Sequence, residues 1–77
     1  MSETLLDVQG LSCPLPVLKA NKALRALPPG AQLVVLATDP AAAKDFPAYC
    51  AETGHELVEA AEAEGVWRFV LRKKEAA

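Results

Sequence analysis

The residues best suited to chemistry in this chain are Cys13-Pro14-Leu15-Pro16. A thiol at the first turn of a helix has its thiolate stabilised by the helix dipole and by free backbone N–H groups. Proline is tolerated there because its missing N–H would have no partner anyway. If Cys13 caps the helix, the Leu15 N–H is the one donor left for the sulfur, since neither proline can donate. The motif predicts a single reactive thiol that carries sulfur, because no second cysteine lies two or three residues away.

Three other side chains are candidates for supporting roles. Asp7 closes an apolar segment ahead of the Cys13 loop, so we expect it to orient this loop through backbone N–H groups. Cys50 shares an apolar helical stripe and is expected to be a core thiol, with a resolving thiol as the alternative. His55 is the only histidine and would act as a general base for Cys13 if the fold brought them together; otherwise it marks a turn. The cysteines lack the close ligand pairs of zinc sites, and we expect neither a metal nor a cofactor.

Charge is distributed unevenly along the chain. No acidic residue lies between Val8 and Thr38, whereas residues 51–66 contain five glutamates and no lysine or arginine. Three basic side chains fall on one face of the helix predicted after Cys13: Lys19, Lys22 and Arg25. They would help hold a thiolate or attract an acidic partner, and the alternative is an ordinary solvated helix face. The net charge of −2 gives no reason to expect nucleic-acid binding.

Hydropathy patterns predict the elements that position these residues. Apolar runs and turn residues indicate strands at residues 4–8, 32–38, 55–63 and 66–73, with helices at 14–27 and 45–53. We expect Asp39, followed by proline, to cap a single turn and Asp45 to cap the second helix, with Pro47 in its first turn. Glu64 and Gly65 are expected to form a hairpin turn.

The order βαβαββ favours an α+β fold: a two-layer α/β sandwich in which two helices cover one face of a four-stranded mixed sheet. Residues 1–77 are expected to form one domain, since apolar residues make up 52% of the chain and charged residues 23%. No apolar run approaches the roughly 20 residues of a membrane span. The two cysteines and the absence of a recognisable export signal indicate a cytoplasmic protein with reduced thiols.

In these motifs the chain resembles the TusA/SirA family of small sulfur-carrier proteins. The resemblance rests on Leu6-Asp7, Gly10-Leu11, Cys13-Pro14-Leu15-Pro16, Gly30, Asp39-Pro40, Asp45-Phe46-Pro47, Cys50, Gly54-His55-Glu56-Leu57 and the closing strand. It implies the same βαβαββ sandwich. It also implies that Cys13 accepts sulfane sulfur as a persulfide. We hypothesise that Lys19, Lys22 and Arg25 form part of the docking face beside Cys13.

The implied partners are a sulfur donor, either a cysteine desulfurase or a rhodanese, and a sulfur acceptor. The resemblance leaves open whether the sulfur serves tRNA thiolation, molybdenum-cofactor maturation or sulfur oxidation. A chain this small has little room for a substrate cleft, so we expect a carrier and not a multiple-turnover enzyme with its own small-molecule pocket. Its open sheet face is compatible with a monomer or with weak self-association. Two alternatives remain: an interaction module in which Cys13 is only structural, and a redox pair of Cys13 with Cys50.

Overall fold

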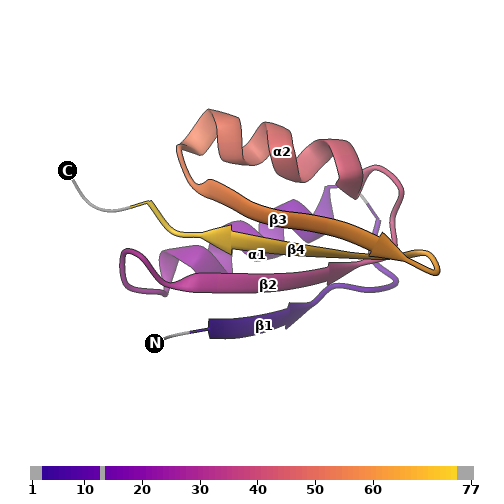
Figure 1. The fold of residues 1–77 in the computed structure, drawn as a ribbon, viewed down its shortest axis with the longest axis horizontal. Helices are drawn as coiled ribbons and strands as arrows, with labels where there is room; N and C mark the ends of the chain where they lie inside the picture. The colour runs from indigo at the N-terminus through magenta and orange to yellow at the C-terminus, as the bar shows by residue number, and fades with distance from the viewer. Residues whose placement is uncertain (1–2, 13, 75–77) are drawn as a thin grey trace.

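The computed structural model describes residues 3–12 and 14–74. Its elements follow the predicted order: β1 (Glu3–Asp7), α1 (Leu15–Arg25), β2 (Gln32–Ala37), α2 (Ala42–Thr53), β3 (Glu56–Ala63) and β4 (Val66–Arg72) (Figure 1). None of the described helices is long and apolar enough to cross a membrane.

The four strands form one mixed sheet in the order β1-β2-β4-β3. β1 pairs with β2 in parallel, whereas β4 is antiparallel to both β2 and β3. Both helices lie on one side of this sheet (Figure 1), which confirms the expected two-layer α+β sandwich. Because β1 and β2 are parallel, their carboxyl ends meet at one edge. The β1–α1 loop therefore lies beside the segment that leads into α2.

The core lies between the helices and the covered face of the sheet. Phe69 is fully buried between two other rings, with centroids 4.8 Å from Phe46 and 5.7 Å from Trp67. The other fully buried large side chains are Leu24, Leu33, Leu71, Val8 and Val35. Alternate residues of β2 and β4 supply most of this layer, as period-two burial in a strand requires.

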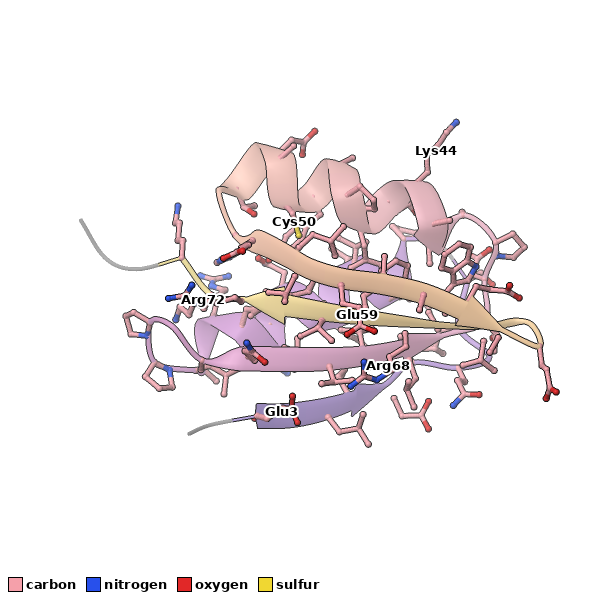
Figure 2. All side chains as sticks on the ribbon, viewed as in Figure 1. Glu3, Lys44, Cys50, Glu59, Arg68 and Arg72 are labelled. Carbon is pink, nitrogen blue, oxygen red and sulfur yellow. The ribbon has the colours of Figure 1, made fainter. Side chains whose placement is uncertain are left out.

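The opposite face of the sheet is open and carries ion pairs over an apolar centre. Arg68 of β4 pairs with Glu59 of the neighbouring β3 at 3.3 Å (Figure 2). A second pair, Arg72 with Glu56 at 3.4 Å, joins the same two strands. Val70 stands between the two arginines on this face and is only 5% exposed. Long arginine stems can cover apolar surface while their charged ends stay in water. This face of the sheet is therefore partly exposed to solvent.

β3 forms an outer edge of the sheet and differs from a regular strand. Its register with β4 shifts between Leu57 and Glu59, which marks a β-bulge. The hairpin that follows turns at Glu64 and Gly65, whose φ angles are 53° and 84°. Two successive positive φ values are the signature of a type I′ turn. The predicted hairpin is therefore confirmed.

The prediction for the second helix is wrong at its start. α2 is one continuous helix from Ala42, and Asp45 lies within its first turn instead of capping it. The Asp39 carboxylate accepts a 3.1 Å hydrogen bond from the Ala41 N–H. The backbone carbonyl of Asp39 accepts another, of 2.9 Å, from the Ala42 N–H. The turn that Asp39 organises therefore runs directly into the helix, which leaves Pro47 in its interior.

Candidate functional site

Cys13 lies outside the described residues, but the segments on both sides of it are described. Pro14 is the N-cap of α1, with φ −97° and ψ 14°, and Leu15 and Pro16 are the first two helical residues. The helix therefore begins one residue later than predicted. As a result, Pro14 is the N-cap and not the first helical residue, and Pro16 is the second helical residue and not the third. Cys13 directly precedes the cap in the chain.

The Leu15 N–H, which we predict to serve the Cys13 sulfur, has a backbone partner in the structure. It donates a 2.9 Å hydrogen bond to the Ser12 carbonyl, three residues earlier in the chain. The adjoining Pro14 and Pro16 have no N–H to donate. This bond competes with the predicted contact to the Cys13 sulfur, which lies outside the described residues. The helix dipole and nearby cations also favour negative charge at the start of α1.

Two hydrogen bonds hold the loop that leads from β1 toward Cys13. The Asp7 carboxylate accepts a 3.0 Å hydrogen bond from the Gln9 N–H, which is the kind of loop contact expected of Asp7. The Gly10 N–H donates to the Thr38 hydroxyl at 2.8 Å, and Gly10 has a φ of 84°. The sequence analysis missed Thr38, because its partner lies 28 residues away. Its only local signal is a hydroxyl placed just after a buried strand.

The three predicted basic residues are exposed side chains on α1. With a rise of 1.5 Å per residue, Lys19 lies about 6 Å along the axis from Leu15, whereas Lys22 and Arg25 lie about 10 and 15 Å away. Screening in physiological salt has a length of about 8 Å. Lys19 is therefore close enough to act on the charge at the start of α1, while Lys22 and Arg25 are better placed to contact a partner.

Two leucines near the start of α1 are exposed, and the sequence analysis did not select them as a surface. Leu15 is 45% exposed and Leu18 56%. Both lie off the apolar stripe of the helix, in which Ala20 and Leu24 are fully buried. That departure from the helical period is the signal that could have identified them. They give the start of α1 an apolar surface next to its basic side chains.

A groove of about 250 Å³ lies between α1 and α2, and we refer to it as the α1–α2 groove. Six residues line it: Pro14, Val17, Asp45, Ala48, Tyr49 and Glu52. It was not predicted, because it depends on how the two helices pack. Pro14 places it next in the chain to Cys13.

Cys50 is a core thiol, as predicted. Its side chain belongs to the buried cluster under α2 and is 5% exposed, with its sulfur directed toward the sheet (Figure 2). Burial raises the pKa of this thiol. A buried neutral thiol is a poor nucleophile, because the thiolate is the reactive form.

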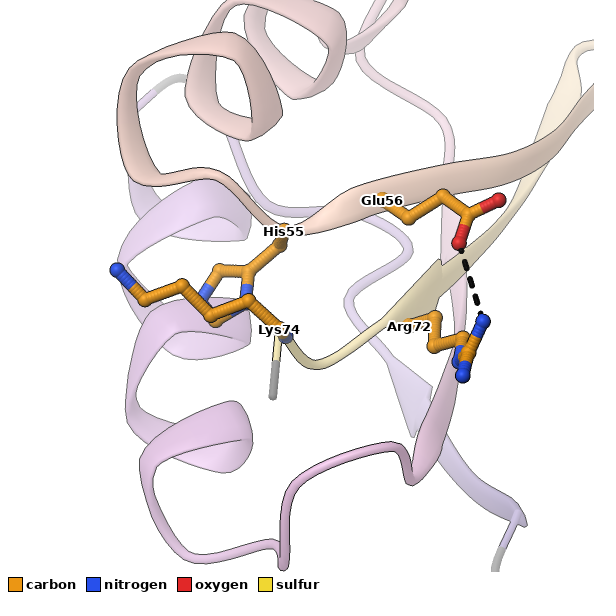
Figure 3. A network of polar contacts seen from close by, with 4 residues as sticks. All are labelled: His55, Glu56, Arg72 and Lys74. Atoms are coloured by element: carbon orange, nitrogen blue, oxygen red, sulfur yellow. Dashed lines mark hydrogen bonds and ion pairs between the residues drawn. The ribbon is translucent and has the colours of Figure 1, made fainter. Parts of the chain in front are cut away.

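His55 lies just beyond the C-terminal end of α2, the opposite end from Asp45. Its Nδ1 accepts a 3.0 Å hydrogen bond from the Lys74 N–H, close to the ion pair of Glu56 and Arg72 (Figure 3). Desolvation, followed by the charges of Lys74 and Lys73, lowers the pKa of its imidazole. These contacts favour the structural role at a turn over that of general base.

Within residues 3–12 and 14–74, no group of three or more His, Cys, Asp or Glu side chains is arranged to hold a metal ion. The candidate site of the described chain is therefore the start of α1, with its fixed loop, its exposed leucines and the adjoining groove.

The chain is similar in sequence to known proteins over most of its length. The family model described as sulfurtransferase TusA matches residues 4–73. A putative sulfur carrier protein of Neisseria meningitidis serogroup A is 50% identical over 74 residues, covering 96% of this chain and all of that protein. The sulfur carrier protein TusA of Allochromatium vinosum is 48% identical over 68 residues, covering 88% of this chain and 90% of the relative.

A solved structure shares the fold. The crystal structure of a SirA-like protein from Desulfitobacterium hafniense superposes with a TM-score of 0.82 at 27% sequence identity. The match covers 94% of this chain and 99% of the other.

Proposed function

The chain belongs to the TusA family, and we propose that it is a sulfur carrier that holds sulfane sulfur as a persulfide on Cys13. The observation that carries this proposal is the position of Cys13, directly before the N-cap of α1 in a Cys-Pro-x-Pro motif. A cysteine at that position has the helix dipole behind it. The exposed Leu15 and Leu18 leave the start of the helix open to another protein.

The transfer is a thiol exchange in which atoms and electrons balance. The Cys13 thiolate attacks the outer sulfur of a persulfide on the donor protein, and the sulfur–sulfur bond of the donor breaks. The donor leaves as a thiolate, and Cys13 becomes Cys–S–SH. An acceptor thiolate then attacks the terminal sulfur, and Cys13 leaves as a thiolate. No external oxidant or reductant is needed, because each step exchanges one sulfur–sulfur bond for another.

Activation of Cys13 needs more than the helix alone. The dipole contributes about 0.3–1 kcal/mol to an anion at an exposed helix terminus, whereas one pKa unit corresponds to about 1.4 kcal/mol. Since the Leu15 N–H is already bonded to Ser12, the additional stabilisation has to come from Lys19 or from the docked partner. The proposal therefore describes a thiol that becomes most reactive within a complex.

The partners are a sulfur donor, such as a cysteine desulfurase or a rhodanese, and an acceptor protein. Lys22 and Arg25, together with Lys19, form a basic docking face on α1 that suits an acidic partner surface. The exposed leucines supply the apolar part of the contact. The protein is proposed to act as a monomer or weak oligomer in the cytoplasm, where thiols stay reduced. Its sulfur would serve tRNA thiolation, molybdenum-cofactor maturation or sulfur oxidation.

The first test is intact mass after incubation with a bacterial cysteine desulfurase and cysteine. The wild-type chain should gain one sulfur that a reductant removes. The Cys13→Ser variant should gain none, and Cys50→Ser should load normally, because Cys50 is buried.

Other outcomes would contradict the proposal in distinct ways. Loss of loading in both single variants would indicate a redox pair of Cys13 and Cys50. If the wild-type chain gains no sulfur from the desulfurase, from a rhodanese or from polysulfide, the carrier function is wrong, and an interaction module becomes the better interpretation.

A further inference from the structure

The α1–α2 groove has no role in the proposed exchange, although Pro14 places it beside the reactive cysteine in the chain. Its floor is apolar and is formed by Val17, Ala48 and the ring of Tyr49. The Tyr49 hydroxyl donates a 2.9 Å hydrogen bond to the Asn21 side chain, which fixes the ring between the two helices. The floor of the groove is therefore held in place before any partner arrives.

The polar residues of this groove are two carboxylates, both from α2. Asp45 and Glu52 are seven residues apart, which is two turns or about 10 Å along one helical face. Within the described residues, neither carboxylate accepts a hydrogen bond or joins an ion pair, in contrast to Glu56 and Glu59 on the sheet. The groove therefore presents two carboxylates that have no hydrogen-bonded or ion-paired partner among the described residues, above an apolar floor.

This combination fits a cation on an aliphatic stem. The side chain of arginine covers apolar surface with its methylene groups and offers a planar fork of donors to carboxylates. We propose that the α1–α2 groove receives one arginine side chain of the sulfur-exchange partner, from a residue close to the reactive cysteine of that partner. The inference rests on the proposed carrier function and deepens it by describing the surface that the partner must present.

The charged side chains of α1 and those of the groove have opposite signs, and this sets what a partner must present. Lys19, Lys22 and Arg25 on α1 attract acidic groups, whereas Asp45 and Glu52 attract a basic one. A partner must therefore carry an arginine within otherwise acidic surroundings. A surface of a single charge would be repelled by one side or the other. The pair of surfaces thus fixes the orientation in which a partner cysteine approaches Cys13.

The test measures how Cys13 selects between two peptides. Each is a short acetylated peptide whose cysteine forms a mixed disulfide with thionitrobenzoate, and an arginine or a glutamine stands two residues from that cysteine. Two residues of extended chain span about 7 Å, so the side chain can reach the groove when the peptide sulfur meets Cys13. The Cys13 thiolate attacks the peptide sulfur and releases thionitrobenzoate, whose absorbance reports the rate.

At low salt the wild-type chain should react about two- to fivefold faster with the arginine peptide, as expected for an exposed ion pair. D45N/E52Q should react equally with both peptides. The matched control is E3Q/E64Q, which removes two charges away from the groove and should keep the preference. Cys13→Ser corrects for any reaction of Cys50, and circular dichroism confirms that each variant is folded.

Two results would overturn the inference: a wild-type chain that does not distinguish the peptides, or a preference that survives in D45N/E52Q. Neither result would affect the carrier function, which is tested separately by persulfide loading of the same wild-type preparation. Failure of the groove and failure of the carrier are therefore distinguishable.

Discussion

The Tyr49 hydroxyl donates a 2.9 Å hydrogen bond to the Asn21 side-chain oxygen and joins α2 to α1 across their interface. The side chain of Tyr49 is 9% exposed, and burial raises the pKa of its phenol. The same ring forms part of the floor of the α1–α2 groove. One contact therefore connects the packing of the helices to the surface beside Cys13.

Removing this hydroxyl should weaken the protein modestly. We expect Tyr49→Phe to lower the free energy of unfolding by about 0.5–1.5 kcal/mol, the usual net contribution of one hydrogen bond. Urea denaturation of Tyr49→Phe, Asn21→Ala and the double variant measures the coupling. If the two single losses simply add, the side chains do not interact, and the contact has no energetic role.

Thr38 should control the loop that leads to Cys13. Thr38→Val removes the acceptor of the Gly10 N–H, and we expect a loss of about 1 kcal/mol in stability together with slower persulfide loading. Amide exchange at Gly10 should become faster, while Thr38→Ser, which keeps the hydroxyl, should resemble the wild-type chain. Unchanged exchange at Gly10 in Thr38→Val would show that this hydrogen bond does not hold the loop.

The basic docking face on α1 should affect association and should depend on salt. We expect K22E/R25E to slow loading from a protein donor about tenfold at low salt, because both charges that attract the partner become repulsive. The difference should shrink as salt rises. The matched reversal K44E/K74E lies elsewhere and should load normally. Equal loading by the two double variants would exclude Lys22 and Arg25 from docking.

The buried thiol of Cys50 should make stability depend on pH. Burial raises its pKa above the ordinary value of 9.0. The native protein therefore keeps a proton that the unfolded chain releases, so the free energy of unfolding falls as pH rises through about 9. Urea denaturation between about pH 8 and 9.5 should show a smaller decline in Cys50→Ala than in the wild-type chain. Parallel declines would mean that Cys50 titrates alike in both states.

The hairpin between β3 and β4 can be improved without touching the site. Glu64 adopts a φ of 53°, which is unfavourable for a side chain other than asparagine, aspartate or glycine. Glu64→Asn creates the Asn-Gly pair preferred in type I′ turns and should raise the free energy of unfolding by about 0.5–1 kcal/mol. Glu64→Gln removes the same charge without this preference. If it stabilises equally, the gain comes from charge and not from the backbone.

Local patterns in the sequence predicted the fold well. The apolar run at residues 66–73 indicated the strand β4, and the Glu64-Gly65 pair indicated the hairpin. The predicted start of α2 was wrong because Asp45 and Pro47 are both residue types that are common in the first turn of a helix. What decides the matter is the hydrogen bonding around Asp39, which begins the helix earlier. Asp39 and Asp45 are both suitable caps six residues apart, and the residue types alone do not determine which of them begins the helix.

The candidate site was predictable only where its residues are neighbours in the chain. The Cys-Pro-x-Pro motif and the contact of Asp7 with its loop fall in this class. The hydrogen bond from Gly10 to Thr38 and the groove between Pro14 and Glu52 join residues far apart in sequence. They depend on the parallel pairing of β1 with β2 and on the packing of the two helices. Neither the strand pairing nor the helix packing can be deduced from one segment of the chain alone.

The bulge in β3 affects whether copies of this protein can associate through the edges of their sheets. An exposed strand with free backbone groups is a template on which another chain can add a strand and start an aggregate. The shift between Leu57 and Glu59 disrupts that template, and the glutamates along β3 add repulsion between copies. These two features make the free edge of β3 a poor template for strand addition by another copy of the chain.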